Sequence, residues 1–323
     1  MPRIDVLGVE HTYDLTTPVA SGPVLVFVHG WLLSRRYWMP LIEQLAPSYQ
    51  CLSYDLRGFG ESRLPEVVSS TQPLDAKSMR FDREVIAANV GLPEALSPYS
   101  LAAYAQDLVV LLKQLNIPRA WIVGHSLGGS IALWAATLAP QVVEGVVCLN
   151  AGGGIYYKEA FDQFRQAGQQ MLGVRPRWLP YFPCIDLLFS RIMVASPLQR
   201  DWGRQRVVDF VAAHPEAALR SLLDSTSPEE VHRLPQVVSQ IQQPVYFLAG
   251  LQDRVMEPRY VYHLASFHPG FCDGTSAVIE IPNCGHMGML EQTDVVASHL
   301  HAIVSSQDCV CPPSYAAQPY VSN

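Results

Sequence analysis

The sequence predicts an α/β protein with a mostly parallel central sheet and helices on both faces of that sheet. Short runs of β-branched and other apolar residues recur along the chain. Most of these runs are followed by a segment whose apolar residues return every three or four positions. Strands that alternate with helices build parallel sheets covered on both faces. Three segments break the alternation and mark additions to this basic fold.

The predicted elements follow one another in a regular order. For the stretch 4–15, ahead of the first parallel strand, an antiparallel edge hairpin is the alternative to a part in the parallel alternation. Parallel strands are predicted at 24–28, 51–54, 120–123, 143–149, 245–249 and 278–281. Helices are predicted at 35–45, 101–115, 127–138 and about 295–304, because each segment carries an apolar stripe on one helical face.

The three interruptions divide the chain into a core in two parts and two additions. The core comprises 1–152 and 239–304, and its first part contains a long insertion at about 63–98. Residues 153–238 have a mostly helical pattern and are predicted to form a helical cap over the sheet. Residues 305–323 have the composition of a disordered tail.

Composition excludes several classes of protein. With 49% hydrophobic residues in 323, the chain can bury a large core and is not a disordered protein. The net charge is −7 and no basic run stands out, so we expect no nucleic-acid partner. No apolar run is long enough to span a bilayer. The irregularly spaced cysteines and the absence of an N-terminal signal stretch favour reduced thiols and a cytoplasmic location.

A nucleophile is predicted at Ser126. It lies in Gly124-His125-Ser126-Leu127-Gly128-Gly129, between a strand that ends at Val123 and a helix that begins near Leu127. A G-x-S-x-G pattern in this context places serine on a sharp strand-to-helix turn, and the small neighbours let strand and helix approach each other. The turn exposes the serine oxygen above the sheet.

A serine hydroxyl needs a base, and the base needs a carboxylate that orients it. His286 follows the last strand on a glycine-containing loop, and Asp253 follows the preceding strand. Loops at the carboxyl ends of parallel strands present catalytic groups. An acid after the strand 143–149 is the alternative, but Asn150-Ala151-Gly152 offers none. Ser126, Asp253 and His286 are therefore the predicted catalytic residues.

A site for a developing oxyanion is predicted beside the serine. His29-Gly30-Trp31 follows the first parallel strand, and the glycine permits a tight turn above the sheet. The backbone amides of Trp31 and Leu127 would form the oxyanion hole. An ordinary strand-end turn at this place is the alternative.

Together these stretches resemble the α/β-hydrolase fold superfamily, in its esterase and lipase branch. The resemblance also includes Tyr54-Asp55-Leu56-Arg57-Gly58-Phe59-Gly60, which we interpret as a structural turn network, and it covers about 22–152 and 240–304. It implies that Ser126 is the nucleophile, His286 the general base and Asp253 the orienting acid. The resemblance fits an ester hydrolase and equally a carbon–carbon bond hydrolase, a lyase or a perhydrolase. A protein of this fold that binds without turnover is a further alternative.

The substrate is inferred from the predicted cap, which is rich in aromatic residues. Aromatic side chains bring large apolar area to a pocket, so we expect an ester of a hydrophobic substrate such as a lipid or a prenyl or pigment ester. The predicted pocket residues are Trp178, Tyr181, Phe182 and Met287. The segment 177–182 is also suited to peripheral contact with a membrane. The sequence calls for no metal and no cofactor, and it leaves the oligomeric state open.

Overall fold

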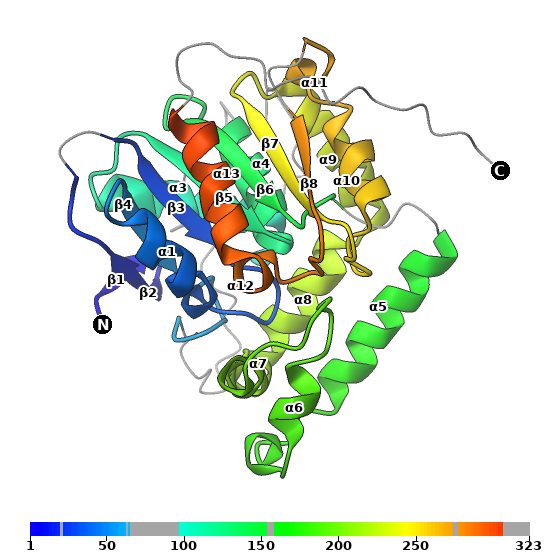
Figure 1. Cartoon of the computed structure of the whole chain (residues 1–323). Coiled ribbons are helices and arrows are strands. Elements are labelled where there is room, and N and C mark those ends of the chain that lie inside the picture. The colour runs from blue at the N-terminus through cyan, green and yellow to red at the C-terminus, as the bar shows by residue number, and fades with distance from the viewer. Residues whose placement is uncertain (20–21, 63, 65–96, 154–157, 274–276, 306–323) are drawn as a thin grey trace.

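The fold is built around one twisted sheet with helices packed on both faces (Figure 1). A computed structural model describes residues 1–19, 22–62, 64, 97–153, 158–273 and 277–305. In these ranges the strands are β1 (Arg3–Val6), β2 (Val9–Leu15), β3 (Val24–Val28), β4 (Gln50–Tyr54), β5 (Ala120–His125), β6 (Val143–Leu149), β7 (Val245–Gly250) and β8 (Ala277–Ile281).

The strand order across the sheet is β1-β2-β4-β3-β5-β6-β7-β8. β1 pairs with β2 and β2 with β4 in antiparallel fashion, while every pair from β4 through β3 to β8 is parallel. The antiparallel edge hairpin, given as the alternative for 4–15, is thus what the structure shows, and the predicted mostly parallel sheet is confirmed. Because these parallel strands all point the same way, the loops after β3, β5, β7 and β8 meet at one edge of the sheet.

The core lies in two layers, one on each face of the sheet. Leu25 and Phe27 of β3 pack with α1 (Met39–Leu45) and α13 (Thr293–Ser305), whereas Val26 and Val28 pack on the other face with α3 (Leu101–Gln114) and α4 (Leu127–Leu138). Successive residues of a strand point to opposite faces, so a strand with no polar residue is buried on both sides.

The chain between β6 and β7 forms a helical insertion. Its helices in the described residues are α5 (Lys158–Gly173), α6 (Ile185–Phe189), α7 (Arg200–Ala212), α8 (Pro215–Ser225) and α9 (Pro228–Gln240), with the 3₁₀ helix η2 (Leu179–Tyr181) between α5 and α6. The remaining helices are α10 (Pro258–Ala265), α11 (Pro269–Asp273) and α12 (Gly288–Glu291). The mostly helical pattern predicted for 153–238 agrees with these elements.

One predicted helix differs in the structure, and two predicted segments cannot be compared with it. The predicted helix 35–45 is a 3₁₀ helix η1 (Arg35–Trp38) followed by α1, and Pro40 lies in the first turn of α1, where its missing N–H is tolerated. The long insertion predicted at 63–98 and the tail predicted at 305–323 lie almost entirely outside the described residues.

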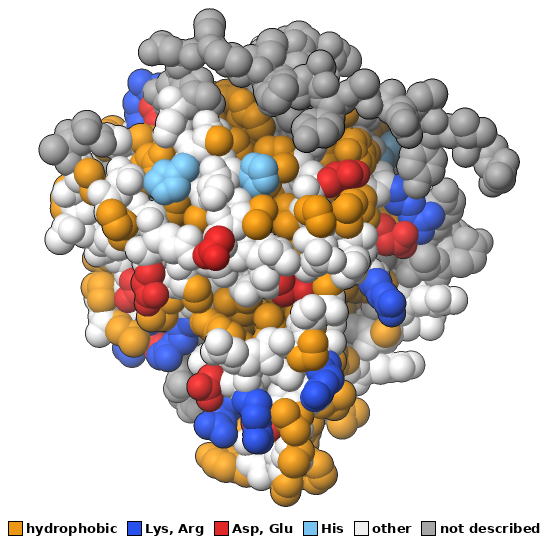
Figure 2. All heavy atoms as spheres, viewed as in Figure 1, with side chains coloured by type: hydrophobic (Ala, Val, Ile, Leu, Met, Phe, Trp, Pro, Cys, Tyr) orange, Lys and Arg blue, Asp and Glu red, His pale blue; other side chains and the backbone are white. Residues whose placement is uncertain are grey.

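The helical insertion exposes several large apolar side chains around η2 and α6. Trp178, Tyr181, Phe182 and Leu188 are all more than half exposed, and Tyr181 reaches 87%. Figure 2 shows hydrophobic side chains gathered at the lower tip of the molecule, with Lys or Arg side chains beside them, at the end where Figure 1 draws α6. None of the helices within the described ranges has the length and apolar character needed to cross a bilayer.

Candidate active site

Ser126 stands on the turn between β5 and α4 in a backbone conformation that side chains rarely adopt, with φ 53° and ψ −117°. Two glycines are required because the backbone approaches itself closely here. A Cβ on Gly124 would lie 2.2 Å from the carbonyl oxygen of Gly128, and a Cβ on Gly128 would lie 2.2 Å from that of Val28. The sharp turn predicted from G-x-S-x-G is confirmed.

Ser126, His286 and Asp253 lie in one chain of hydrogen bonds. Nε2 of His286 is 3.1 Å from Oγ of Ser126, and Nδ1 of His286 is 2.7 Å from Oδ2 of Asp253. A carboxylate only accepts, so Nδ1 carries the proton and Nε2 is free to accept from the serine hydroxyl. The structure therefore brings together the three predicted catalytic residues, from the loops after β5, β7 and β8.

The carboxyl group of Asp253 is held in its ionised form. Its Oδ1 accepts from the amides of Val255 and Met256 at 2.8 and 2.9 Å. Burial on its own raises the pKa of Asp253, but the attraction of His286 and the hydrogen bonds from His286 and the two amides outweigh burial and leave the pKa below its ordinary value. The carboxylate is thus suited to orient the imidazole and to stabilise its charged form.

Asn150 is a residue of this site that the sequence analysis did not find. Its Nδ2 donates to Oδ2 of Asp253 and to the carbonyl oxygen of Gly285, each at 3.0 Å. Asn150 follows β6, where an alternative acid was sought and not found. It supplies a donor to the acid instead, and it links the loop of Asp253 to the loop of His286.

Glu291 clamps the backbone on both sides of His286. Its carboxylate accepts from the amides of Gly285 at 3.0 Å and Met287 at 2.9 Å, and also from the amide of Ala195 in the helical insertion at 2.7 Å. The amide of His286 donates to the carbonyl oxygen of Met193, again in the insertion, at 2.8 Å. The histidine loop is therefore fixed partly by the insertion.

His125 also positions the histidine loop. Its Nε2 lies 2.6 Å from the carbonyl oxygen of His286, so Nε2 carries the proton and donates. Burial and then the neighbouring His286 lower the pKa of His125 to about 3, which keeps the ring neutral. This hydrogen bond joins the serine turn to the loop of His286.

Trp31 and Leu127, whose amides are the predicted oxyanion hole, line the same cavity as Ser126. Nε2 of His29 accepts from the amide of Leu56 at 2.9 Å, so its Nδ1 carries the proton and donates to the carbonyl oxygen of Gly30 at 2.8 Å. The carbonyl of Gly30 and the N–H of Trp31 belong to one peptide plane and point in opposite directions. The hydrogen bond from His29 to this carbonyl therefore also fixes the direction of the Trp31 N–H. Among the described residues, neither this amide nor that of Leu127 has an acceptor.

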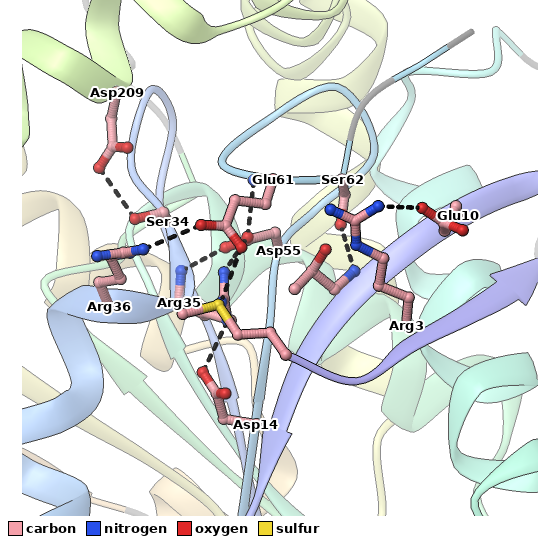
Figure 3. Close-up of polar contacts among 12 residues, drawn as sticks. Arg3, Glu10, Asp14, Ser34, Arg35, Arg36, Asp55, Glu61, Ser62 and Asp209 are labelled. Atoms are coloured by element: carbon pink, nitrogen blue, oxygen red, sulfur yellow. Dashed lines mark hydrogen bonds and ion pairs between the residues drawn. The ribbon is translucent and has the colours of Figure 1, made fainter.

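The charged residues after β4 form a structural network (Figure 3). The carboxylate of Asp55 accepts from the guanidinium of Arg35 and from the backbone amides of Arg35 and Glu61. Arg57 pairs with Asp107 of α3. These groups are not among the residues that line the cavity beside Ser126, which agrees with the structural role predicted for this turn.

A cavity of about 210 Å³ lies beside Ser126. Trp31, Leu127 and Met287, which the sequence predicts for this site, are among its lining residues. The helical insertion contributes most of the remaining wall, and its apolar side chains there are Phe164, Met171, Phe189, Ile192, Met193, Phe210 and Leu222. The cavity is therefore mostly apolar, and its polar lining residues include Ser126, His286 and Arg206.

The structure does not bring Trp178, Tyr181 and Phe182 to this cavity. They do not belong to its lining, and all three are more than half exposed. The segment around η2 is irregular because of its prolines, and an irregular segment has no helical period that would indicate its inner face. Other aromatic residues of the same stretch, Phe189 and Phe210, line the cavity in their place.

The described part of the chain contains no cluster of three or more histidine, cysteine, aspartate or glutamate side chains that could hold a metal ion. The two histidines of the site are both committed to hydrogen bonds, His286 to Ser126 and Asp253, and His125 to a carbonyl.

Comparisons with known proteins agree with this geometry. A pimeloyl-[acyl-carrier protein] methyl ester esterase of Xanthomonas campestris pv. campestris (strain B100) is 27% identical over 294 residues, which cover 89% of this chain and 97% of that protein. The chloroplastic protein PHYLLO of Arabidopsis thaliana is 30% identical over 156 residues, or 47% of this chain. The chain spans only 8% of the length of PHYLLO.

The fold is shared with solved structures at lower identity. A bromoperoxidase from Bacillus anthracis has a TM-score of 0.71 at 17% identity, and the match covers 92% of this chain and 96% of that one. A family model described as the alpha/beta hydrolase fold matches residues 23–293, which include the serine turn, both loops of its hydrogen-bonded partners and the helical insertion. The chain belongs to the alpha/beta hydrolase fold family.

Proposed function

We propose that this chain is a serine hydrolase that cleaves carboxylic esters through an acyl-enzyme. The observation that carries the proposal is the hydrogen-bonded chain from Ser126 through His286 to Asp253. Ser126 and His286 line an apolar cavity. The similarity to a methyl ester esterase over nearly the whole chain supports ester hydrolysis as the reaction class.

In the first half of the reaction, Oγ of Ser126 attacks the ester carbonyl carbon while Nε2 of His286 takes the hydroxyl proton. The negative charge that develops on the carbonyl oxygen is stabilised by the amides of Trp31 and Leu127. The bond to the leaving alcohol then breaks, and the proton on Nε2 passes to the alcohol oxygen. The acyl group remains on Ser126.

In the second half, water takes the place of the alcohol. His286 accepts a proton from the water as its oxygen attacks the acyl carbon, and it returns that proton to Oγ of Ser126 as the serine leaves. The products are a free acid and the regenerated enzyme. Asp253 keeps the imidazole in the required orientation through both halves and needs no protonation change of its own.

Labelling with a fluorophosphonate probe tests the activated serine. We expect the native protein to be labelled and Ser126→Ala to remain unlabelled, whereas Ser130→Ala, a buried serine of the same helix, is labelled like the native protein. Labelling without turnover of any ester would favour the carbon–carbon bond hydrolase, lyase or perhydrolase alternatives. Absence of labelling in the native protein would contradict the proposal.

The apolar lining supports a hydrophobic acyl or alcohol group, such as that of a lipid or prenyl ester. Phe164, Phe189 and Phe210 stand around the cavity, and burial of a hydrocarbon chain against them supplies binding energy in proportion to its area. On a graded ester panel, kcat/KM should rise with chain length until the cavity is filled. A preference for short polar esters would contradict this substrate class.

The exposed residues Trp178, Tyr181, Phe182 and Leu188, here called the apolar tip, support peripheral contact with a membrane. Aromatic side chains suit the interfacial layer, and the exposed Arg177 and Arg191 beside them suit anionic headgroups. Met171, Ile192 and Met193 are partly exposed and also line the cavity. Part of the apolar cavity wall is therefore also exposed on the surface of the insertion, as the entry of a hydrophobic ester from a bilayer would require.

Vesicle binding tests the membrane contact. The native protein should sediment with vesicles that contain phosphatidylglycerol more than with neutral phosphatidylcholine vesicles, and replacement of Trp178, Tyr181 and Phe182 by serine should abolish the difference. Equal sedimentation of native and variant proteins would overturn the proposed membrane contact.

The free thiols of Cys51, Cys148 and Cys284 support a reducing, cytoplasmic location for the chain.

A further inference from the structure

Arg206 of α7 is a buried cation in the wall of the active-site cavity. Its exposed fraction is 7%, and it lines the same space as Ser126 and His286. Arginine is almost never buried to this extent without a carboxylate partner, because the charge loses its hydration. The groups in contact with the Arg206 guanidinium therefore decide whether its charge is compensated within the protein.

The contacts of Arg206 satisfy only part of its guanidinium. Nη1 donates to the carbonyl oxygens of Phe189 at 2.6 Å and Ile192 at 2.7 Å, and Nη2 has the sulfur of Met193 at 3.8 Å. Among the described residues, no aspartate or glutamate lies within ion-pair distance of it. Glu291 acts on it only from farther away, and that carboxylate is already bound by backbone amides.

The buried arginines of the core differ from Arg206 in this respect. Arg35 is paired with Asp55, and Arg57 with Asp107, and each of these aspartates is itself buried. Within the described part of the core, each buried guanidinium thus has an opposite charge as its partner. Burial lowers the pKa of Arg206, in keeping with a cation that has dipoles around it but no counter-charge.

We propose that Arg206 is a specificity-determining residue that binds a carboxylate of the substrate, away from the ester bond. This inference rests on the proposed ester hydrolysis and names its substrate class: an ester with an apolar body and a terminal carboxylate, such as a half-ester of a dicarboxylic acid. A carboxylate fits better than a phosphate, because a single guanidinium in an apolar cavity matches one negative charge and the planar geometry of a carboxylate.

Arg206 also has a structural role, which the test must separate from substrate binding. The carbonyls it holds belong to the segment that continues to Met193, and the carbonyl of Met193 accepts from the amide of His286. Loss of this support would slow the hydrolysis of every ester by the same factor. Loss of a carboxylate partner would slow only the esters that carry a carboxylate.

The test compares monomethyl esters of straight-chain dicarboxylic acids with methyl esters of monocarboxylic acids of equal length. The native enzyme should prefer the half-esters in kcat/KM by about tenfold or more, mainly through KM. Arg206→Met should abolish this preference, lowering kcat/KM for the half-esters about tenfold more than for the neutral esters, whatever common loss both series share. Arg206→Lys, which retains the charge, should keep part of the preference. Arg200→Gln, an exposed arginine on the same helix that pairs with Asp186, serves as the matched control and should keep all of it.

Two outcomes would overturn the proposal: no preference in the native enzyme, or an equal loss on both ester series in Arg206→Met. A separate measurement keeps it testable if no ester is turned over. In the Ser126→Ala background, calorimetry should show saturable binding of a straight-chain dicarboxylate that Arg206→Met removes. Binding without turnover would contradict the proposed function and support the carboxylate site, whereas absence of binding would contradict the site.

Discussion

The core and the helical insertion bury polar groups in different ways. In the core, charged side chains meet opposite charges, and the turn of Ser126 is fixed by backbone atoms that leave no room for a Cβ. In the insertion, Arg206 is buried against carbonyl dipoles alone, and large apolar side chains face outward. The difference is in keeping with our proposal that the core supplies a fixed reaction geometry and the insertion supplies the surface that selects a substrate.

The boundary between the two regions carries polar contacts as well. Trp31, whose amide is a predicted oxyanion donor, donates from its indole Nε1 to the carbonyl of Ala218 in α8 at 2.8 Å. Ser34 of the core donates to Asp209 of α7 at 2.9 Å. The insertion therefore rests on the loops that form the site, and the following predictions separate its contribution from that of the core.

The largest effect is expected from Gly128→Ala in the core. The new Cβ would lie 2.2 Å from the carbonyl oxygen of Val28 and 2.7 Å from that of His29, and neither backbone atom can move away without disturbing β3. We expect a loss of about 3 kcal/mol of unfolding free energy or more, or a failure to fold, together with loss of activity. Urea unfolding and ester hydrolysis measure the two effects.

The matched control for this substitution lies in the insertion. Gly173 ends α5, is exposed and has no atom within 4 Å of a Cβ position. Gly173→Ala should leave activity unchanged and gain up to about 1 kcal/mol from helix propensity. If both glycine variants lost stability equally, the contrast between the fixed turn and the open helix end would be wrong.

The next effect is a pH dependence at the boundary. Burial raises the pKa of Asp209 from 3.8 to about 6. Between these values the folded chain holds more protons than the unfolded chain, so stability falls as the pH rises through this window and stays lower above it. Asp209→Asn should remove this loss, which amounts to at most about 3 kcal/mol.

Urea unfolding at several pH values between 4 and 8 checks this prediction. The stability of Asp209→Asn relative to the native protein should rise through the window, and Ser34 still finds an acceptor in the asparagine oxygen. The prediction fails if the two proteins show the same slope, or if the variant is the less stable one at the upper end.

A smaller effect is expected from Asn150 in the core. Asn150→Ala removes the hydrogen bonds that Nδ2 donates to Oδ2 of Asp253 and to the carbonyl of Gly285. We expect kcat to fall by about tenfold and KM to stay nearly unchanged, because the substrate does not contact Asn150. Asn150 has a φ of 50°, which alanine tolerates poorly. Asn150→Gly should therefore match Asn150→Ala in activity and exceed it in stability. Full activity of either variant would remove Asn150 from the site.

The smallest effect is expected at the apolar tip. Trp178 is 59% exposed, so Trp178→Ser should change the unfolding free energy by no more than about 0.5 kcal/mol. The same substitution at Trp134, which is fully buried in α4, should destabilise the protein by several kcal/mol and provides the contrast. A large loss of stability in Trp178→Ser would show that the tip packs against the rest of the chain.

The sequence predicts the core well because its signals are local. Ser126 is set by small residues two positions away on either side, and Asp253 and His286 each follow a short apolar strand at the edge where such loops meet. Such local patterns can be recognised in the sequence without knowledge of contacts between distant segments. For the same reason the alternation of strands and helices was sufficient to predict the parallel sheet.

The contacts that the sequence does not reveal are those between distant segments. Asn150 and Glu291 act through hydrogen bonds to backbone groups in other loops. A single asparagine or glutamate in the sequence does not indicate which distant group it will bind. The inward face of the insertion is unpredictable from composition alone. Phe189 lines the cavity while Phe182, seven residues earlier, faces outward, because their orientation depends on how α6 and η2 pack.

The clamp on the histidine loop has a consequence for protein engineering. Ala195 shares the carboxylate of Glu291 with Gly285 and Met287, and Met193 holds the amide of His286. An exchange of the helical insertion for that of a relative is therefore not an exchange of a self-contained module. A chimera must keep the 193–195 backbone, or supply equivalent groups, for its grafted pocket to sit above a working base.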